Sequence, residues 1–272
     1  MIKLIAIDMD GTLLNSQKQI PTENIVALQQ ASKKGIKIVL CTGRPKSGIV
    51  PYFEQLGLTD EEYIIMNNGC SVYNTKNWDL IVSEELSYAE IKRLNRTCAS
   101  YDDVYLTLTG DKSYYVLADE VPDLVQYDAS LVFDTARAID EFELKKEGEI
   151  IFQAMYMAKK ASLDVFQADV DKELSQDFST VRSQEYIYEI LPQGISKASG
   201  LKQLARKLHI APSEIMALGD AANDVEMLAF VGVSVAMGNA SDDIKRRCRY
   251  TTNSNDDCGV AKAIYDYALL GR

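Results

Sequence analysis

The segment that most constrains the fold runs from residue 3 to residue 14, KLIAIDMDGTLL. Its apolar run, Leu4–Ile7, suits a strand buried on both faces, which is typical of the centre of a parallel sheet. The run ends abruptly at two carboxylates, Asp8 and Asp10. In extended backbone this spacing puts both side chains on one face, where they repel each other unless a cation lies between them.

These residues allow a specific chemistry. A hard cation with oxygen ligands fits two carboxylates, and Mg²⁺ is the natural candidate. If the backbone bends after Asp8, the two side chains can divide the roles of nucleophile and general acid or base. Gly11 allows a sharp turn and lets phosphate oxygens approach backbone N–H groups. A simpler interpretation stays open for this segment alone, because Asp-Gly pairs are common in turns.

The chain around this segment alternates between strand and helix patterns. This rhythm predicts parallel strands with right-handed crossovers, and it resumes after residue 196. We therefore expect an α/β fold, with a doubly wound, Rossmann-like parallel-sheet core and an inserted α+β cap domain. In such open sheets ligands bind beyond the carboxyl ends of the strands. The first helices are expected over residues 22–34 and 46–56, and the strands that accompany them over 36–41 and 63–66.

A middle section departs from the rhythm. Between residues 84 and 191 the patterns predict two β-hairpins, over 104–117 and 178–191, with helices around them. The hairpins indicate a separate module inserted into the α/β chain. We expect residues 1–83 and 192–272 to form the core domain, and residues 84–191 to form the cap.

Composition restricts the partners. The chain has 272 residues and a net charge of −11, which argues against nucleic-acid binding because that function favours a basic surface. No apolar stretch approaches the length of a membrane span, and the N-terminus is too short and too soon acidic for a secretory signal. The five cysteines contain no CxxC pair, so reduced thiols in a cytoplasm are the simplest account. We predict a cytoplasmic monomer or weak homodimer without nucleic-acid or membrane partners.

Further polar residues stand where strands end or helices begin. They offer carboxylates for Mg²⁺, an ammonium group and several neutral donors, an inventory that suits phosphoryl transfer. Asp8 would attack phosphorus and form an aspartyl-phosphate, while Asp10 would protonate the leaving oxygen and then activate water. The other members of this set are Thr42, Gly43, Lys197, Asp220, Asn223 and Asp224.

At this point a resemblance is plain. DMDGTLL, CTGRP, the Lys197 segment and GDAANDVEM resemble, in order, the four motifs of the haloacid dehalogenase-like phosphatase superfamily. The Asn-Asn-Gly at 67–69, the MGNA at 237–240 and the later Gly259-Val260 resemble its Cof-type sugar-phosphatase branch. The chain departs from the pattern at Ala198-Ser199, where Gly often follows the motif Lys, and at Cys258, where an acidic residue is common. Neither position donates a catalytic atom.

The resemblance implies roles for individual residues. Asp8 falls on the nucleophile, and Asp10 falls on the acid/base, whose backbone carbonyl also binds the metal. Arg44 has two open interpretations, a bridge between core and cap or a substrate contact. The expected phosphate-binding residues are Met9, Thr42, Gly43, Lys197 and Asn223; the expected Mg²⁺ ligands are Asp8, Asp10 and Asp220; and the expected supporting residues are Arg44, Asn68 and Asp224.

The favoured function is a Mg²⁺-dependent phosphatase that hydrolyses a small phosphorylated metabolite, with a sugar phosphate as the first choice. One alternative is a phosphotransferase or mutase on the same scaffold, which needs a cap that excludes water. Another alternative is a non-catalytic protein that binds phosphometabolites. In the family such caps close over the site and carry the residues that select the substrate, and the resemblance implies the same here.

Overall fold

The computed structural model describes residues 1–270, and contacts group the chain into two compact units. The first unit comprises Met1–Gly43, Val50–Val82 and the chain from Ser196 onward. The second comprises Arg44–Ile49 and Ser83–Ile195. Each unit is built on its own β-sheet.

The first unit contains an eight-stranded sheet in the order β14-β13-β12-β1-β2-β3-β4-β5. The strands from β14 to β3 are parallel, and β4 returns antiparallel to β3. Central β1 lies between β2 and β12, so all five of its residues are buried. The strands are β1 (Leu4–Asp8), β2 (Lys37–Cys41), β3 (Tyr63–Met66), β4 (Ser71–Asn74), β5 (Leu80–Ser83), β12 (Ile215–Gly219), β13 (Val233–Ala236) and β14 (Tyr250–Thr251).

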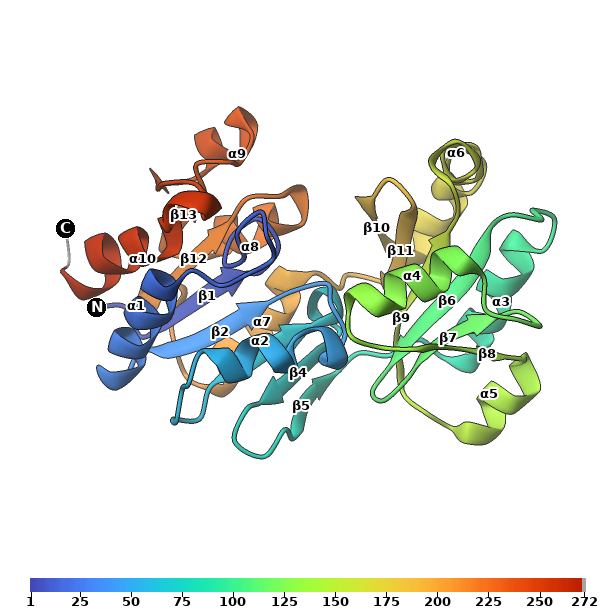
Figure 1. Cartoon of the computed structure of the whole chain (residues 1–272), viewed down its shortest axis with the longest axis horizontal. Helices are drawn as coiled ribbons and strands as arrows, with labels where there is room; N and C mark the ends of the chain where they lie inside the picture. The colour runs from blue at the N-terminus through green and yellow to red at the C-terminus, as the bar shows by residue number, and fades with distance from the viewer. Residues whose placement is uncertain (271–272) are drawn as a thin grey trace. The chain divides into compact units, whose positions relative to one another are not determined.

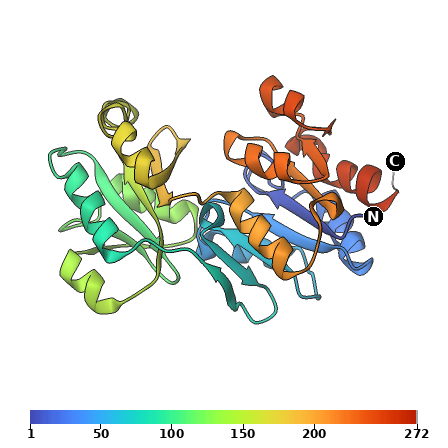
Figure 2. The same ribbon diagram turned by 180° about the vertical axis from the view of Figure 1, so that it is seen from behind.

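Helices cover both faces of this sheet. Leu4 and Ala6 pack with Leu201 of α7 and Met227 of α8, so the alternate residues Ile5 and Ile7 point to the opposite face. Figure 1 shows α1 and α2 in front of the sheet, and the reverse view in Figure 2 brings α7 to the front. The helices are α1 (Thr22–Lys33), α2 (Val50–Gln55), α7 (Lys197–Lys207), α8 (Val225–Phe230), α9 (Asp242–Arg247) and α10 (Gly259–Ala263), which continues as a π-helix over Ile264–Leu269.

The second unit contains a six-stranded sheet in the order β10-β11-β9-β6-β7-β8. Neighbouring strands are antiparallel except β7 and β8. Helix α4 covers one face and appears in front of the sheet in Figure 1, while α3, α5 and α6 pack on the other face. The elements are α3 (Tyr88–Cys98), β6 (Tyr105–Gly110), β7 (Tyr114–Leu117), α4 (Asp123–Leu131), β8 (Ala136–Ile139), α5 (Glu141–Glu147), β9 (Ile151–Met157), α6 (Lys160–Asp177), β10 (Phe178–Gln184) and β11 (Ile187–Pro192).

Several short elements differ from the sequence prediction. Residue 139 ends strand β8, where it pairs with Leu117, and does not begin one of the helices predicted around the hairpins. The helix begins after Asp140, whose side chain accepts a hydrogen bond from the Glu143 N–H at 2.8 Å. Strands β4, β5 and β14 were not predicted either; each has two to four residues, a length at which a period is weak evidence for a strand.

The segment Arg44–Ile49 groups with the second unit, although the sequence suggested the first. Gly48 lies against Val132, so close that a Cβ atom on Gly48 would sit 2.9 Å from the Val132 Cβ. The long segment of the second unit runs from Ser83 to Ile195, whereas the sequence predicts a cap over residues 84–191. Long-range packing of this kind has no local signature in the sequence.

Across residues 1–270, none of the helices has the length and apolarity that crossing a bilayer requires.

Candidate active site

Asp8 ends the central strand β1 and is 4% exposed. The two-residue period places its side chain on the face of Leu4 and Ala6, the face that packs on α7 and α8. Its Oδ1 accepts a hydrogen bond from Lys197 Nζ at 2.5 Å. Its Oδ2 is buried and has no hydrogen-bond partner among the described residues. Buried acceptors without a partner are rare, so this oxygen points to a ligand or ion that binds there.

Lys197 is the first residue of α7, and its side chain is 2% exposed. The helix start is fixed by a capping box, in which Ser196 and Ser199 exchange side-chain and backbone hydrogen bonds. Gly69 has φ +107° and lies so close to this start that a Cβ atom would sit 2.1 Å from the Ser196 carbonyl oxygen. The turn at Gly69 therefore helps to place Lys197, which also contacts Asp224 Oδ1 at 2.8 Å.

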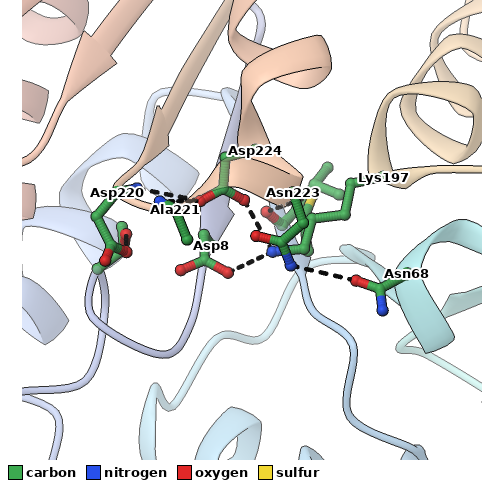
Figure 3. A network of polar contacts seen from close by, with 10 residues as sticks. Asp8, Asn68, Lys197, Asp220, Ala221, Asn223 and Asp224 are labelled. Atoms are coloured by element: carbon green, nitrogen blue, oxygen red, sulfur yellow. Dashed lines mark hydrogen bonds and ion pairs between the residues drawn. The ribbon is translucent and has the colours of Figure 1, made fainter. Parts of the chain in front are cut away.

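Asp224 uses both of its carboxylate oxygens within the protein, as Figure 3 shows. Oδ1 accepts from Lys197, and Oδ2 accepts from the backbone N–H groups of Asp220 and Ala221, each at 3.0 Å. The side chain is fully buried. Asp224 therefore ties the loop that carries Asp220 to the ammonium group that contacts Asp8.

The electrostatics of this group are dominated by burial. Burial raises the pKa of Asp8 well above its ordinary value, the charge of Asp224 raises it further, and Lys197 opposes both. For Lys197, burial lowers the pKa, but the carboxylates of Asp224 and Asp8 outweigh burial and raise it. Lys197 is thus held as a cation, and its charge favours the ionised form of Asp8, which a nucleophile requires.

Asp220 approaches the same place from the end of β12. Its Oδ1 accepts a hydrogen bond from Thr12 Oγ1 at 2.8 Å, and its Oδ2 would lie 2.4 Å from a Cβ atom on Gly11. Gly11 has φ +86°, so this turn requires glycine for both conformation and space. Burial raises the pKa of Asp220, and the Thr12 hydrogen bond partly offsets that effect.

These carboxylates could hold a metal ion. One oxygen from each of Asp8, Asp220 and Asp224 lies within 4.8 Å of the others. Because both oxygens of Asp224 already accept hydrogen bonds, Asp8 and Asp220 are the better ligands, and Asp224 orients the loop. An all-oxygen donor set with a buried, unpartnered oxygen fits Mg²⁺.

Asp10 is more exposed than Asp8, and Lys18 contacts its carboxylate. Its Oδ1 forms an ion pair with Lys18 Nζ at 2.8 Å, and 39% of the Asp10 side chain is exposed. Among the described residues, Asp10 is not part of the group formed by Asp8, Asp220 and Asp224. Its expected roles as acid/base and as a carbonyl ligand stay predictions.

Four of the expected phosphate and supporting residues meet next to this group. The Asn68 N–H donates to the Thr42 carbonyl at 3.0 Å, and Asn223 Nδ2 donates to Asn68 Oδ1 at 3.4 Å. A Cβ atom on Gly43 would lie 2.9 Å from Asn68 Nδ2, so the two residues are in close contact. Segments far apart in sequence thus gather amide donors at the carboxyl ends of β2, β3 and β12.

Two other predicted site residues, Met9 and Arg44, are placed by the turn after β1 and by the second unit, respectively. The Met9 side chain is fully buried, and its carbonyl accepts from the N–H groups of Thr12 and Leu14, so this carbonyl serves the turn. Arg44 lies in the second unit, where Nη1 donates to the Gly48 carbonyl at 3.3 Å. The contributions of both residues to substrate binding stay predictions.

Sequence reasoning missed two contacts of this site. Thr12, which contacts Asp220, is not among the predicted site residues, although its place in Asp-Gly-Thr is a signal for a hydroxyl near the carboxylates. Lys18 contacts Asp10 eight residues away across a loop. Nothing in its local sequence indicates that contact.

Comparison with known proteins identifies the family. A model of the haloacid dehalogenase-like hydrolase family matches residues 5–264. The protein named "Putative phosphatase YxeH" from Bacillus subtilis (strain 168) is 33% identical over 287 residues, which cover 99% of each chain. The protein named 5-amino-6-(5-phospho-D-ribitylamino)uracil phosphatase YcsE, from the same organism, is 30% identical over 98% of this chain and 96% of its own.

Solved structures show the same fold. A haloacid dehalogenase-like hydrolase from Bacteroides thetaiotaomicron superposes with a TM-score of 0.88 at 29% identity, over 97% of this chain and 99% of its own. The predicted α/β fold class and the predicted family are therefore confirmed, and so is the prediction of a phosphatase-type hydrolase. The chain belongs to the haloacid dehalogenase-like hydrolase family.

Proposed function

We propose that this protein is a Mg²⁺-dependent phosphatase that hydrolyses a small phosphorylated metabolite through an aspartyl-phosphate on Asp8. The observation that carries the proposal is the state of the Asp8 carboxylate. One oxygen is held by Lys197 at 2.5 Å, and the other is buried without a partner among the described residues. A carboxylate held in this way is fixed in orientation and has an oxygen available for a ligand.

The reaction follows from the residues. The Asp8 carboxylate attacks phosphorus, the bond to the leaving oxygen breaks, and Asp10 gives that oxygen a proton. Asp10 then takes a proton from the water that attacks the aspartyl-phosphate, which releases inorganic phosphate and regenerates Asp8. Lys197 and the donors of Thr42, Gly43 and Asn223 stabilise the charge on the phosphoryl oxygens.

Asp8 and Asp220 would hold the Mg²⁺ ion, which would offset the repulsion between an anionic nucleophile and an anionic substrate. Within the protein, Asp224 supports this arrangement by fixing the backbone of Asp220. The buried carboxylate of Asp8 and the half-buried carboxylate of Asp220 would otherwise repel one another, which supports the proposal of a cation between them.

We propose a sugar phosphate or a related phosphorylated polyol as the substrate. The relative YcsE is named for a substrate that carries a phosphorylated ribityl chain, and the resemblance noted in the sequence is to sugar phosphatases. We assign substrate selection to the second unit, the inserted module around β6–β11. The cytoplasmic location, the monomeric or weakly dimeric state and the absence of nucleic-acid and membrane partners stay predictions.

The test is a steady-state assay of phosphate release over a panel of sugar phosphates, polyol phosphates and phosphorylated carboxylic acids. We expect turnover with Mg²⁺, none in EDTA, and recovery when Mg²⁺ is restored. Asp8→Asn should abolish turnover, because it removes the attacking charge with little change in volume. Thr251→Ser, an exposed strand residue outside the site, is the control.

Two results would contradict the proposal. One is full turnover in chelated buffer, and the other is substantial turnover by Asp8→Asn. Transfer of phosphate to an added sugar in preference to water would instead favour the phosphotransferase or mutase. A folded wild-type protein that binds the panel compounds but turns none over would favour the non-catalytic alternative.

A further inference from the structure

The chain that follows Asp10 forms a loop, Gly11–Gln19, whose base is buried at residues 12–14 and whose tip is exposed. Asn15 organises its tip, because Asn15 Oδ1 accepts from the N–H groups of Gln17 and Gln19 at 3.0 and 2.9 Å. Residues 16–19 are exposed to solvent. Packing therefore does little to fix the tip of this loop.

Two asparagines from distant parts of the chain hold the base of the loop. Asn239 Nδ2 donates to the Gly11 carbonyl at 2.8 Å, and Asn255 Nδ2 donates to the Leu14 carbonyl at 2.9 Å. The two asparagines are also joined, since Asn239 Oδ1 accepts from the Asn255 N–H at 3.0 Å. The two joined asparagines therefore donate to the carbonyls of Gly11 and Leu14, one on each side of the turn.

Asp256 holds the tip. Its Oδ1 accepts from the Ser16 N–H at 2.7 Å, and its Oδ2 accepts from Ser16 Oγ at 2.6 Å. We call Asn239, Asn255 and Asp256 the loop clamp. All three lie more than 200 residues along the chain from the loop that they hold.

Both the base and the tip of the loop contact Asp10. Asp10 forms a bridge with Leu14 at the base of the loop. From the tip, Lys18 adopts φ +56° and places its Nζ 2.8 Å from Asp10 Oδ1. Because 39% of the Asp10 side chain is exposed, its direction depends more on these neighbours than on core packing.

We infer that Asn239, Asn255 and Asp256 are positioning residues for Asp10, and this inference rests on the function proposed above. The clamp fixes the loop, and the loop fixes the backbone and the side chain of the group that protonates the leaving oxygen. A misplacement of about 1 Å in a catalytic group can cost on the order of 100-fold in rate. The clamp should therefore matter most for substrates whose leaving oxygen requires a proton.

The test compares two esters in the Mg²⁺-loaded full-length protein. The first is the best alkyl phosphate of the panel, whose alkoxide leaves only with a proton. The second is p-nitrophenyl phosphate, whose phenolate leaves without one. Asn255→Asp keeps the shape of the side chain but replaces the donor to the Leu14 carbonyl with an oxygen, and Asn239→Asp does the same at Gly11.

We expect each variant to lose on the order of 10- to 100-fold in kcat for the alkyl phosphate, with little change in KM. The loss with p-nitrophenyl phosphate should be several-fold smaller. Amide hydrogen exchange in residues 11–19 should become faster in both variants. Asn253→Asp is the matched control, because Asn253 is exposed and its Nδ2 donates at 3.3 Å to the Asp257 carbonyl, within its own loop. This variant should match wild type with both esters.

Asn255 is buried, so Asp256→Ala serves as a second, exposed variant should Asn255→Asp fail to fold. It should show the same difference between the esters in a weaker form. Equal losses with both esters, or no loss, would overturn the inference while the proposed function stands. A wild-type protein that hydrolyses neither ester would refute the proposed function itself.

Discussion

Asp224→Asn tests the electrostatic link between Lys197 and the Asp220 loop. The Asp224 carboxylate is fully buried and accepts three hydrogen bonds, one from Lys197 Nζ and two from backbone N–H groups. Asparagine keeps the volume but has one oxygen. Whichever way its amide turns, an NH₂ group faces either the ammonium or the two backbone donors.

The cost can be worked from these contacts. Breaking one partner of a buried ion pair typically costs about 3–5 kcal/mol. Here Asp8 still contacts Lys197 at 2.5 Å, and the repulsion between Asp8 and Asp224 disappears. We therefore expect the free energy of unfolding to fall by about 3 kcal/mol, at the lower end of that range.

The assay is chemical denaturation followed by far-ultraviolet circular dichroism, with Asp243→Asn as the matched control. Asp243 makes the same kind of contact on α9, to Arg247 at 2.8 Å, but its side chain is 59% exposed. That variant should lose no more than about 1 kcal/mol, because exposed ion pairs contribute little. Equal losses in the two variants would refute the reasoning, because burial would then not be the source of the effect.

Two further predictions concern stability. Gly69→Ala should lose more stability than Gly148→Ala. Both positions have positive φ, but a Cβ atom at 69 would sit 2.1 Å from the Ser196 carbonyl oxygen, whereas nothing lies within 4 Å of a Cβ atom at 148. Equal losses by thermal melting would show that the approach of Gly69 to α7 is not tight. Glu62 is buried and accepts from Ser32 Oγ and the Ile38 N–H, each at 2.6 Å. Burial raises its pKa above the ordinary 4.5, so the folded state holds the proton more tightly and its stability falls as the pH rises from about 4.5 through the raised pKa. Glu62→Gln should remove that fall, and a wild-type-minus-variant difference in Tm that does not change with pH would contradict it.

The core fold could be predicted because its central strand carries a clear apolar pattern and because strand and helix patterns alternate around it. The apolar run ends at Asp8 and Asp10, and the parallel register of Ile7 with Leu218 brings the end of β12 beside it. The convergence of Asp8, Lys197, Asp220 and Asp224 follows from that register, because all four lie at or just beyond strand ends or at a helix start.

The rest depended on contacts that the sequence does not display. Short strands such as β8 are defined by pairing rather than by a period. The ion pair between Lys18 and Asp10, and the hydrogen bonds of Asn239 and Asn255 to the loop, join residues through tertiary structure. The place of Arg44–Ile49 in the second unit is likewise set by packing near Val132.

The central claim is that Asp8 is the residue that receives the phosphoryl group. The most direct measurement is acid quench of the Mg²⁺-loaded protein within milliseconds of mixing with substrate, followed by borohydride reduction and peptide mass spectrometry. We predict that residue 8 of the wild-type protein is recovered as homoserine, because borohydride reduces the acyl phosphate to an alcohol and releases the phosphate, and that Asp8→Asn yields none. Rapid release of phosphate with no modification at Asp8, or with modification at another carboxylate, would contradict it.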